Sequence, residues 1–250
     1  MLKETSVVII VKNGAAHIEE LLNSVIDFNE VVIYDNGSTD DTESLARNFP
    51  NVSWYSGDFL GFGPTKAHAV SLAKNDWILS LDADEIVSEA LKNSLLASRM
   101  ENRQAGLILR ENHFLGRAIR YSGWGKDPLI RFFNRTSAQF NDAKVHEQVV
   151  PQQGVSIVQL SGVIKHYAVD DLSQFLEKVN RYSSIRAESG LKARHPILII
   201  LKTFFAFFRT YILKLGLLDG WRGLVISVSN ANGVFWKYIK AYAKKKVKNS

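Results

Sequence analysis

Short apolar runs alternate with helix-like segments through the first ninety residues. Four of the runs have the length and the β-branched or aromatic content of buried strands. They cover residues 6–11, 31–34, 52–55 and 77–81. Segments with helical spacing or turn-and-cap chemistry lie between them, over about residues 18–28, 40–48 and 64–74. Strands that alternate with helices pair in parallel through right-handed crossovers, so the pattern predicts an α/β fold with a Rossmann-like, mostly parallel sheet.

The fourth apolar run ends in three carboxylates, Asp82, Asp84 and Glu85. Charges are costly inside a core, so we expect them at the carboxyl edge of the sheet, where open α/β folds bind ligands. Asp82 and Asp84 alternate along the extended chain and can point to one side. Carboxylate oxygens suit Mg²⁺ or Mn²⁺, which complete their shell with substrate phosphates. The alternative is a solvated acidic turn that caps a helix starting near Ser88.

The middle of the chain continues with a helix to about residue 103 and then with three strand-like segments. These segments cover residues 105–110, 129–134 and 155–165. The loop over residues 121–128 is rich in glycine and aromatic residues and is of the kind that shapes a sugar pocket. A polar amphipathic helix is predicted from Asp170 to about Leu191.

Composition narrows the classes of function. There are no cysteines, which excludes disulfides, thiolate metal sites and a cysteine nucleophile. Residues 1–5 lack the apolar stretch of a secretory leader, so we expect no export. Only one glycine follows the first strand, which argues against a dinucleotide fold. Residues 191–250 hold 12 Lys or Arg and one acidic residue, against 19 and 24 in residues 1–190. That asymmetry suggests an acidic catalytic body with a basic, surface-binding tail.

Residues 197–218 are apolar enough to suggest a membrane span, but three cations interrupt them. Each cation would cost about 2.5–3.5 kcal/mol at the centre of a bilayer. A helical wheel places the cations in one polar sector, which comprises Lys202, Thr203, Arg209, Thr210 and Lys214. The opposite sector holds Ile200, Leu201, Phe204, Phe208, Tyr211 and Leu215. This pattern predicts a helix that lies in the membrane interface.

The last residues repeat the pattern, with aligned apolar side chains and a cluster of lysines for anionic lipid. The apolar set is Phe235, Trp236, Ile239 and Tyr242, and the lysines are Lys237, Lys240, Lys244, Lys245, Lys246 and Lys248. The alternative is a helical hairpin packed on the catalytic domain or on a second subunit. We expect no nucleic-acid partner, because no recognised motif accompanies the lysines and the body is acidic.

Four stretches, in this order and spacing, resemble family 2 glycosyltransferases with the GT-A fold. They are Val7 to Asn13, Asp35 to Thr42, Gly61 to Gly63 with Lys66, and Asp82 to Glu85. Later stretches resemble the bacterial lipopolysaccharide core β-1,4-glucosyltransferases, which add glucose to an inner-core heptose. The resemblance implies a UDP-sugar donor, a lipid-linked saccharide acceptor and a divalent ion.

The resemblance also implies roles for residues of the nucleotide-sugar site. Asp35 would accept a hydrogen bond from uracil, Asp82 would lie near the ribose and the metal, and Asp84 would bind Mg²⁺ or Mn²⁺. Lys66 could reach the nucleotide, and His166 could complete the metal shell. Blander alternatives are a turn-forming Asp35, a solvated Lys66 on its helix, and a His166 that satisfies a local hydrogen bond.

An inverting transfer needs a carboxylate that takes the proton of the acceptor hydroxyl. Glu147 is the first choice, because it resembles the family's acidic residue on the acceptor side, and Asp127 is the second. The alternative for Glu147 is a strand-edge charge paired with Lys144 or Arg131. We therefore expect a glycosyltransferase domain over residues 1–190 and a membrane-attaching extension over residues 191–250, peripheral on the inner face of the cytoplasmic membrane.

Overall fold

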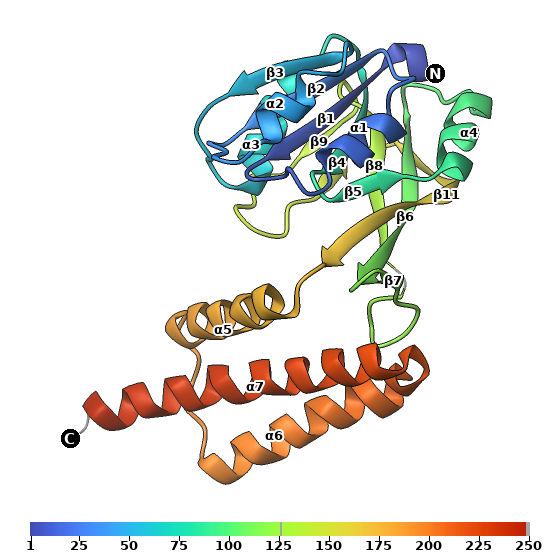
Figure 1. Cartoon of the computed structure of the whole chain (residues 1–250). Helices are drawn as coiled ribbons and strands as arrows, with labels where there is room; N and C mark the ends of the chain where they lie inside the picture. The colour runs from blue at the N-terminus through green and yellow to red at the C-terminus, as the bar shows by residue number, and fades with distance from the viewer. Residues whose placement is uncertain (126, 249–250) are drawn as a thin grey trace. The chain divides into compact units, whose positions relative to one another are not determined.

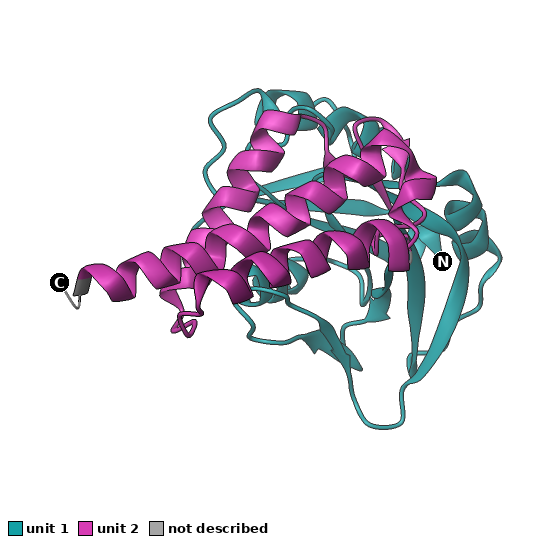
Figure 2. Ribbon diagram, turned by 90° about the horizontal axis from the view of Figure 1, so that it is seen from below, with its two compact units in different colours: residues 1–111, 127–166 teal, residues 112–126, 167–250 magenta. Residues whose placement is uncertain are grey.

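The computed structural model describes residues 1–125 and 127–248 and divides into two compact units (Figure 2). Unit 1 comprises Met1–Glu111 and Asp127–His166, and unit 2 comprises Asn112–Lys126 and Tyr167–Ser250. The boundary between the compact units therefore lies at residues 166 and 167, and unit 2 also includes residues 112–126 from the middle of the chain. The functional boundary expected between residues 190 and 191 stays a prediction.

One mixed sheet forms the centre of unit 1, in the strand order β3-β2-β1-β4-β8-β6-β11-β5, with β7 paired to β6 (Figure 1). Strands β1 to β4 pair in parallel, whereas β8 runs antiparallel to β4 and β6, and β5 antiparallel to β11. The strands are β1 Thr5–Val11, β2 Glu30–Asp35, β3 Val52–Ser56, β4 Trp77–Asp82, β5 Glu85–Val87, β6 Gln104–Phe114, β7 Arg117–Ala118, β8 Asp127–Asn134 and β11 Ser156–Val169. A separate hairpin pairs β9 Ala138–Phe140 with β10 Val149–Pro151.

The four α-helices of unit 1 correspond to the predicted segments and end earlier than predicted, and α3 also begins two residues earlier. They are α1 Ile18–Ser24, α2 Thr42–Ala46, α3 Phe62–Ser71 and α4 Glu89–Ala97, and the 3₁₀ turn η1 covers Leu2–Glu4. The hydroxyl of Ser88 accepts a hydrogen bond from the backbone N–H of Leu91 and caps α4, as the sequence indicated. Every residue of β1 and β2 is buried, as expected of parallel strands in the middle of a sheet.

The strand register places acidic residues on both sides of the end of β1. Val11 pairs with Asp35 of β2, and Ile10 pairs with Asp82 of β4. Since all three strands are parallel, their carboxyl ends share one edge of the sheet, and both carboxylates emerge there. This edge is where open α/β sheets bind ligands.

The antiparallel half of the sheet brings arginines toward the same edge. In β8, Phe132 pairs with Leu79 of β4, so the preceding residue, Arg131, lies nearer the carboxyl end of β4. On the other side of β8, Asp127 pairs with Arg110 of β6. The sequence predicted these strands but not their partners, because the pairing of distant strands leaves no local signal.

Unit 2 is built mainly of three helical segments, and both α5 and α6 pack against α7 (Figure 1). They are α5 Leu172–Glu188, α6 Pro196–Phe208 with a π turn over Arg209–Leu213, a 3₁₀ turn over Gly216–Asp219, and α7 Trp221–Lys248. The predicted helix from Asp170 to Leu191 corresponds to α5. The residue Lys126 and the side chain of Lys248, both named in the sequence predictions, lie outside the described part.

The buried side of α6 and of the π turn after it carries Ile199 and Thr210. Thr210 is buried within hydrogen-bond reach of Asn230 of α7. Just after the π turn, a Cβ at Gly216 would lie 3.2 Å from Oγ of Ser227. Within the predicted sector, Thr210 is buried and Thr203 is half-buried, whereas the three cations are exposed. Thr203 donates to the carbonyl of Ile199 and is half-buried, because the two helices approach closely along this line.

The opposite face of α6 and of the turns after it exposes large apolar side chains. Phe204 is 69% exposed and Ile197 62%. The others are Leu198, Ile200, Leu201, Phe205, Phe208, Ile212, Leu213, Leu215, Leu217 and Leu218. Among the described residues, Pro196–Leu213 is the one helical stretch that is long and apolar enough to cross a membrane, judged by length and composition alone.

Candidate active site

Seven charged side chains of unit 1 form a continuous series of ion pairs in which acid and base alternate. In order they are Glu147, Lys66, Asp82, Arg131, Glu85, Arg110 and Asp127. The series, called here the charge chain, joins α3, the carboxyl ends of β4 and β6, β8 and the loop before β10. It brings together four of the predicted site residues, Lys66, Asp82, Asp127 and Glu147.

Lys66 is almost fully buried, with 1% of its surface exposed. Its Nζ donates to Oδ1 of Asp82 and to Oε1 of Glu147, each at 2.6 Å. The alternative of a solvated lysine on its helix is therefore wrong. A buried ammonium needs compensating charge, and two carboxylates supply it here. The expected reach of Lys66 to a nucleotide stays a prediction.

Asp82 accepts from two cations at once. Arg131 Nη2 lies 2.7 Å from Oδ2, opposite the bond from Lys66 to Oδ1. Burial alone would raise the pKa of Asp82, but the charges of Arg131 and Lys66 outweigh it and hold that pKa well below its usual range. Burial alone would lower the pKa of Arg131, but the charges of Asp82 and Glu85 outweigh it and raise that pKa above its usual value. Asp82 and Arg131 therefore both stay ionised.

Glu85 and Arg110 extend the charge chain to the second candidate base. Glu85 is fully buried, accepts from Arg131 at 2.8 Å and from Arg110 at 3.2 Å, and also accepts from the backbone N–H of Asp82. Arg110 donates through Nε and Nη2 to Oδ2 of Asp127, at 2.9 and 2.6 Å. Desolvation works against the charge of Arg110, but Glu85 and Asp127 raise its pKa above the usual value. Asp127 is thus tied to a permanent cation.

Glu147 lies in the loop between β9 and β10, and its side chain is 15% exposed. It forms its ion pair with Lys66. The sequence alternative, in which Glu147 pairs with Lys144 or Arg131, is therefore wrong. The start of α3 holds this loop: the backbone N–H groups of Phe62 and Gly63 donate to the carbonyls of Lys144 and Ala143. A Cβ on Gly63 would lie 2.1 Å from the carbonyl oxygen of Asn141, so this close approach requires glycine.

Asp35 lies at the end of β2 and is 7% exposed. It accepts from the backbone N–H groups of Gly37 and Ser38 and from the Ser38 hydroxyl, which confirms the turn-forming role. The same turn is tied to the end of β1, because Asn13 accepts from the N–H of Thr39. The uracil contact of Asp35 stays a prediction.

Asp84 lies outside the charge chain, with its side chain 43% exposed and Oδ2 3.5 Å from Nε2 of His166. The antiparallel pairing of β5 with β11, which matches Glu85 with His166, brings them together. Two ligands that share an ion at about 2.1 Å lie roughly 3–4 Å apart, so this pair fits two positions of a Mg²⁺ or Mn²⁺ shell. Among the described residues no set of three or more acidic, His or Cys side chains is arranged to hold a metal. Asp82 commits both oxygens to cations, and its role as a ligand stays a prediction.

Sequence reasoning did not assign Glu85, Arg110 and Arg131 their places in this site. A signal for the arginines was present, since each sits in a strand-like apolar run, Gly106 to Leu109 before one and Leu129 to Phe133 around the other. A charge in such a run needs a buried partner of opposite sign.

The glycine- and aromatic-rich loop over residues 121–128 was expected to shape a sugar pocket. Its Trp124 packs against Phe114 and Phe175 within unit 2, and the expected part of the loop in a sugar pocket stays a prediction.

Comparison with known proteins identifies the family. The profile described as "Glycosyl transferase family 2" matches residues 6–142, more than half of the chain, which includes β1, Asp35, Lys66 and the Asp82 to Glu85 stretch. The chain belongs to glycosyltransferase family 2. This confirms the resemblance drawn from the four sequence stretches and the GT-A fold that it implies.

Relatives of this family 2 glycosyltransferase include bacterial proteins. An uncharacterised glycosyltransferase of Rickettsia typhi is 32% identical over 76% of this chain and 69% of its own length. The lipopolysaccharide core biosynthesis glycosyltransferase LpsC of Rhizobium meliloti is 25% identical over 97% of this chain and 93% of its own. A crystal structure of Staphylococcus aureus TarS in complex with UDP-GlcNAc superposes with a TM-score of 0.48 and 16% identity, covering 98% of this chain and 92% of that one.

Proposed function

We propose that this glycosyltransferase moves glucose from UDP-glucose to the inner-core heptose of lipopolysaccharide or lipooligosaccharide, with inversion and with a divalent ion. The charge chain is the observation that carries the proposal. It fixes a base candidate and the Asp82 carboxylate around one buried lysine, at the sheet edge where α/β folds bind ligands. The similarity over nearly the full chain to LpsC supports a saccharide of the lipopolysaccharide core as acceptor.

The nucleotide half of the donor would lie along the ends of β1, β2 and β4. Asp35 would accept a hydrogen bond from the uracil ring, and Asp82 would face the ribose from the other side of β1. Lys66 would contribute positive charge near the nucleotide without leaving its two carboxylates. Asp84 and His166 would hold Mg²⁺ or Mn²⁺, which when bound neutralises the diphosphate of the departing UDP.

Glu147 would act as the base. As the acceptor hydroxyl attacks the anomeric carbon, the bond from that carbon to the UDP oxygen breaks, and the hydroxyl proton passes to the carboxylate. Lys66 occupies Oε1 of Glu147, and this leaves Oε2 to take the proton. Asp127 is the second candidate: both bonds from Arg110 fall on its Oδ2 and leave Oδ1 to take the proton.

The exposed apolar face of α6 supports peripheral attachment to the cytoplasmic membrane. A large exposed apolar face is costly in water and is typical of surfaces that contact a membrane or a partner protein. Because the proposed acceptor is lipid-linked, attachment would raise its local concentration. α6 packs on α7 as a helical hairpin, and the alternative in which this hairpin packs on the catalytic domain or on a second subunit stays a prediction.

Two other functions compete. One is transfer of another UDP-sugar, such as UDP-galactose, to a different cell-envelope glycan, and the other is a catalytically silent binder of sugar nucleotides. The test is a panel of UDP-sugars, each with Mn²⁺ and a lipopolysaccharide truncated after the inner-core heptose. We expect UDP release and a heptose-linked product with UDP-glucose above all others. Turnover with a different UDP-sugar would favour the first rival, and binding of UDP-glucose without any turnover would favour the second.

A further inference from the structure

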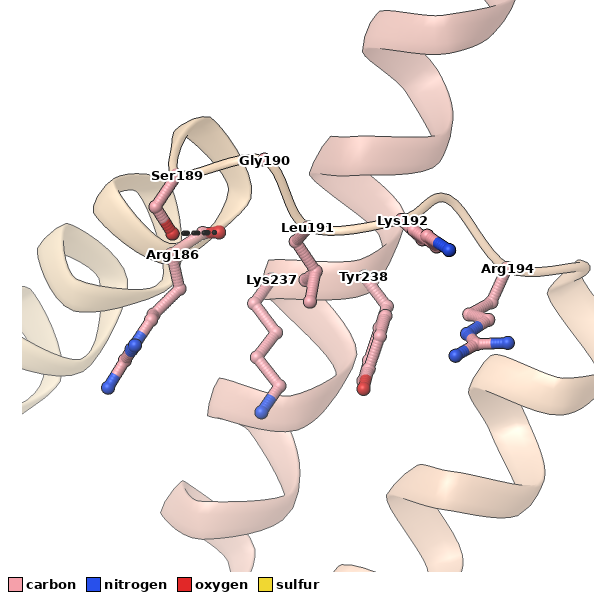
Figure 3. A pocket seen from close by; sticks show the side chains of 8 residues that line it. All are labelled: Arg186, Ser189, Gly190, Leu191, Lys192, Arg194, Lys237 and Tyr238. Carbon is pink, nitrogen blue, oxygen red and sulfur yellow. Dashed lines mark hydrogen bonds between the residues drawn. The ribbon is translucent and has the colours of Figure 1, made fainter.

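Unit 2 contains a basic cavity that the transfer reaction does not use (Figure 3). It has a volume of about 490 Å³ and lies between the segment that joins α5 to α6 and the side of α7. Its charged lining residues are Arg186, Lys192, Arg194 and Lys237, and Ser189 and Tyr238 add hydroxyl groups. These residues come from the last turn of α5, from the connecting segment and from α7, so the cavity gathers cations that are up to 51 positions apart in the sequence.

No carboxylate lines this cavity, and the structure gives its four cations no ion pair within the described residues. Glu188, the nearest acidic residue in the sequence, is exposed on α5 and is not part of the lining. Lys237 and Lys202 instead lie over the ring of Tyr238, at 5.3 and 5.8 Å from its centre. Like charges that line one cavity without counter-charges repel one another, so an anion in the cavity would relieve that repulsion.

The amino end of α6 adds to the positive field. This helix of 13 residues begins at Pro196, and no side chain caps its first N–H groups. The start of a helix carries partial positive charge and unsatisfied donors, which favour an anion. Arg194 lies two residues before the helix, so its positive charge adds to the partial positive charge of the helix start.

The same end of α6 also begins the exposed apolar face. Ile197 and Leu198 are 62% and 47% exposed, and they follow Arg194 within four residues. A phospholipid presents an anionic phosphate directly above its acyl chains, and this arrangement of cations beside apolar side chains is complementary to it. A free phosphate ion would pair with the cations, but it has no acyl chain to contact Ile197 and Leu198.

We propose that this cavity binds the phosphate group of an anionic membrane lipid, with the apolar start of α6 against the acyl chains. The site would fix how unit 2 lies on a bilayer, whereas the lysines near the end of α7 would contribute only general attraction. The proposal is independent of the donor sugar and of the base, because it concerns residues of unit 2 alone.

The test compares two triple variants of the full chain that lose the same charge. One is Arg186→Gln/Lys192→Gln/Arg194→Gln, in the cavity, and the matched control is Lys244→Gln/Lys245→Gln/Lys246→Gln, near the end of α7. Flotation is measured with phosphatidylcholine vesicles that contain phosphatidylglycerol or lack it. We expect the cavity variant to lose affinity for the anionic vesicles by about tenfold or more, and the control to lose clearly less. Equal losses would mean diffuse attraction and would overturn the proposal.

Two further measurements keep the outcome interpretable. Thermal unfolding of both variants should match the wild type, since the replaced side chains are exposed; if the triple variant unfolds early, Lys192→Gln alone, in the connecting segment, replaces it. Inorganic phosphate is then added at the ionic strength of a sodium chloride control. Phosphate that displaces the protein from vesicles no better than chloride supports a lipid, and selective displacement at low millimolar phosphate would show a site for the free ion instead.

Discussion

The Nζ atom of Lys66 lies 2.6 Å from Oε1 of Glu147, although 81 residues separate the two in the chain. The same ammonium lies 2.6 Å from Asp82 at the end of β4. Since Lys66 is buried on a helix, it holds Glu147, the proposed base, and Asp82, which is proposed to face the ribose, at a fixed spacing. A transfer reaction needs such spacing, because donor and acceptor must meet in one geometry.

The first prediction concerns the base. Glu147→Gln keeps the shape of the side chain and one acceptor oxygen for Lys66 but removes the proton acceptor, so kcat should fall by roughly 10²–10⁴-fold with donor binding retained. The measurement is steady-state transfer together with calorimetric binding of the UDP-sugar. Asp127→Asn is the matched control and should lose far less. A large loss in Asp127→Asn and a small one in Glu147→Gln would transfer the role to Asp127.

The second prediction concerns the support of that base. A Cβ at Gly63 would collide with the carbonyl of Asn141, so Gly63→Ala should displace the loop that carries Glu147. A shift on the order of 1 Å can cost about 10²-fold in rate, so kcat should fall by that order. Donor affinity should change little, because the nucleotide would contact other strands. A variant with wild-type kcat would show that the loop tolerates the shift and that the contact does not position the base.

Particular residues show how far sequence alone reached. The alternation of strands and helices and the carboxylates after β4 predicted the parallel half of the sheet and its ligand edge, because both are local patterns. Lys66 was placed on the correct helix, but its burial was not predictable, since the acid that pairs with it lies 81 residues away. Arg131 and Arg110 depend on antiparallel register in the same way. The burial of Thr210 was not predictable either, because a helical wheel carries no information about which neighbour a helix has.

The third prediction concerns the pH dependence of stability. The folded-state pKa of Asp82 is depressed, so its stabilising effect is complete above the unfolded value of about 4 and is lost as the pH falls below it. Asp82→Asn leaves two cations with less counter-charge and should lower the free energy of unfolding at pH 7 by about 3 kcal/mol. Denaturant unfolding from pH 7 to pH 3 should show this difference shrinking below about pH 4. If the difference in the free energy of unfolding between wild type and Asp82→Asn grew as the pH fell, the ion pairs of Asp82 with Lys66 and Arg131 would be contradicted.

The fourth prediction separates membrane attachment from a purely structural hairpin. Phe204→Ser/Phe205→Ser removes two exposed rings from α6, so affinity for anionic vesicles should fall on the order of 10²-fold while the unfolding midpoint stays unchanged. Phe59→Ser/Leu60→Ser removes two exposed apolar side chains from unit 1 and is the matched control for flotation. High salt should weaken wild-type binding without abolishing it, because apolar insertion is not screened. A wild type that fails to float at any salt concentration would refute attachment.

The central claim, a metal-dependent transfer at the carboxyl edge of the sheet, depends most directly on Asp84, which with His166 forms the pair that fits an ion. The deciding measurement is the initial rate of UDP release from UDP-glucose and a truncated lipopolysaccharide, after treatment with EDTA and again after addition of Mn²⁺. The account predicts no turnover in EDTA, full recovery with Mn²⁺ for the wild type, and no recovery for an Asp84→Ala variant of unchanged thermal stability. An undiminished rate in EDTA, or recovery in Asp84→Ala equal to the wild type, would contradict it.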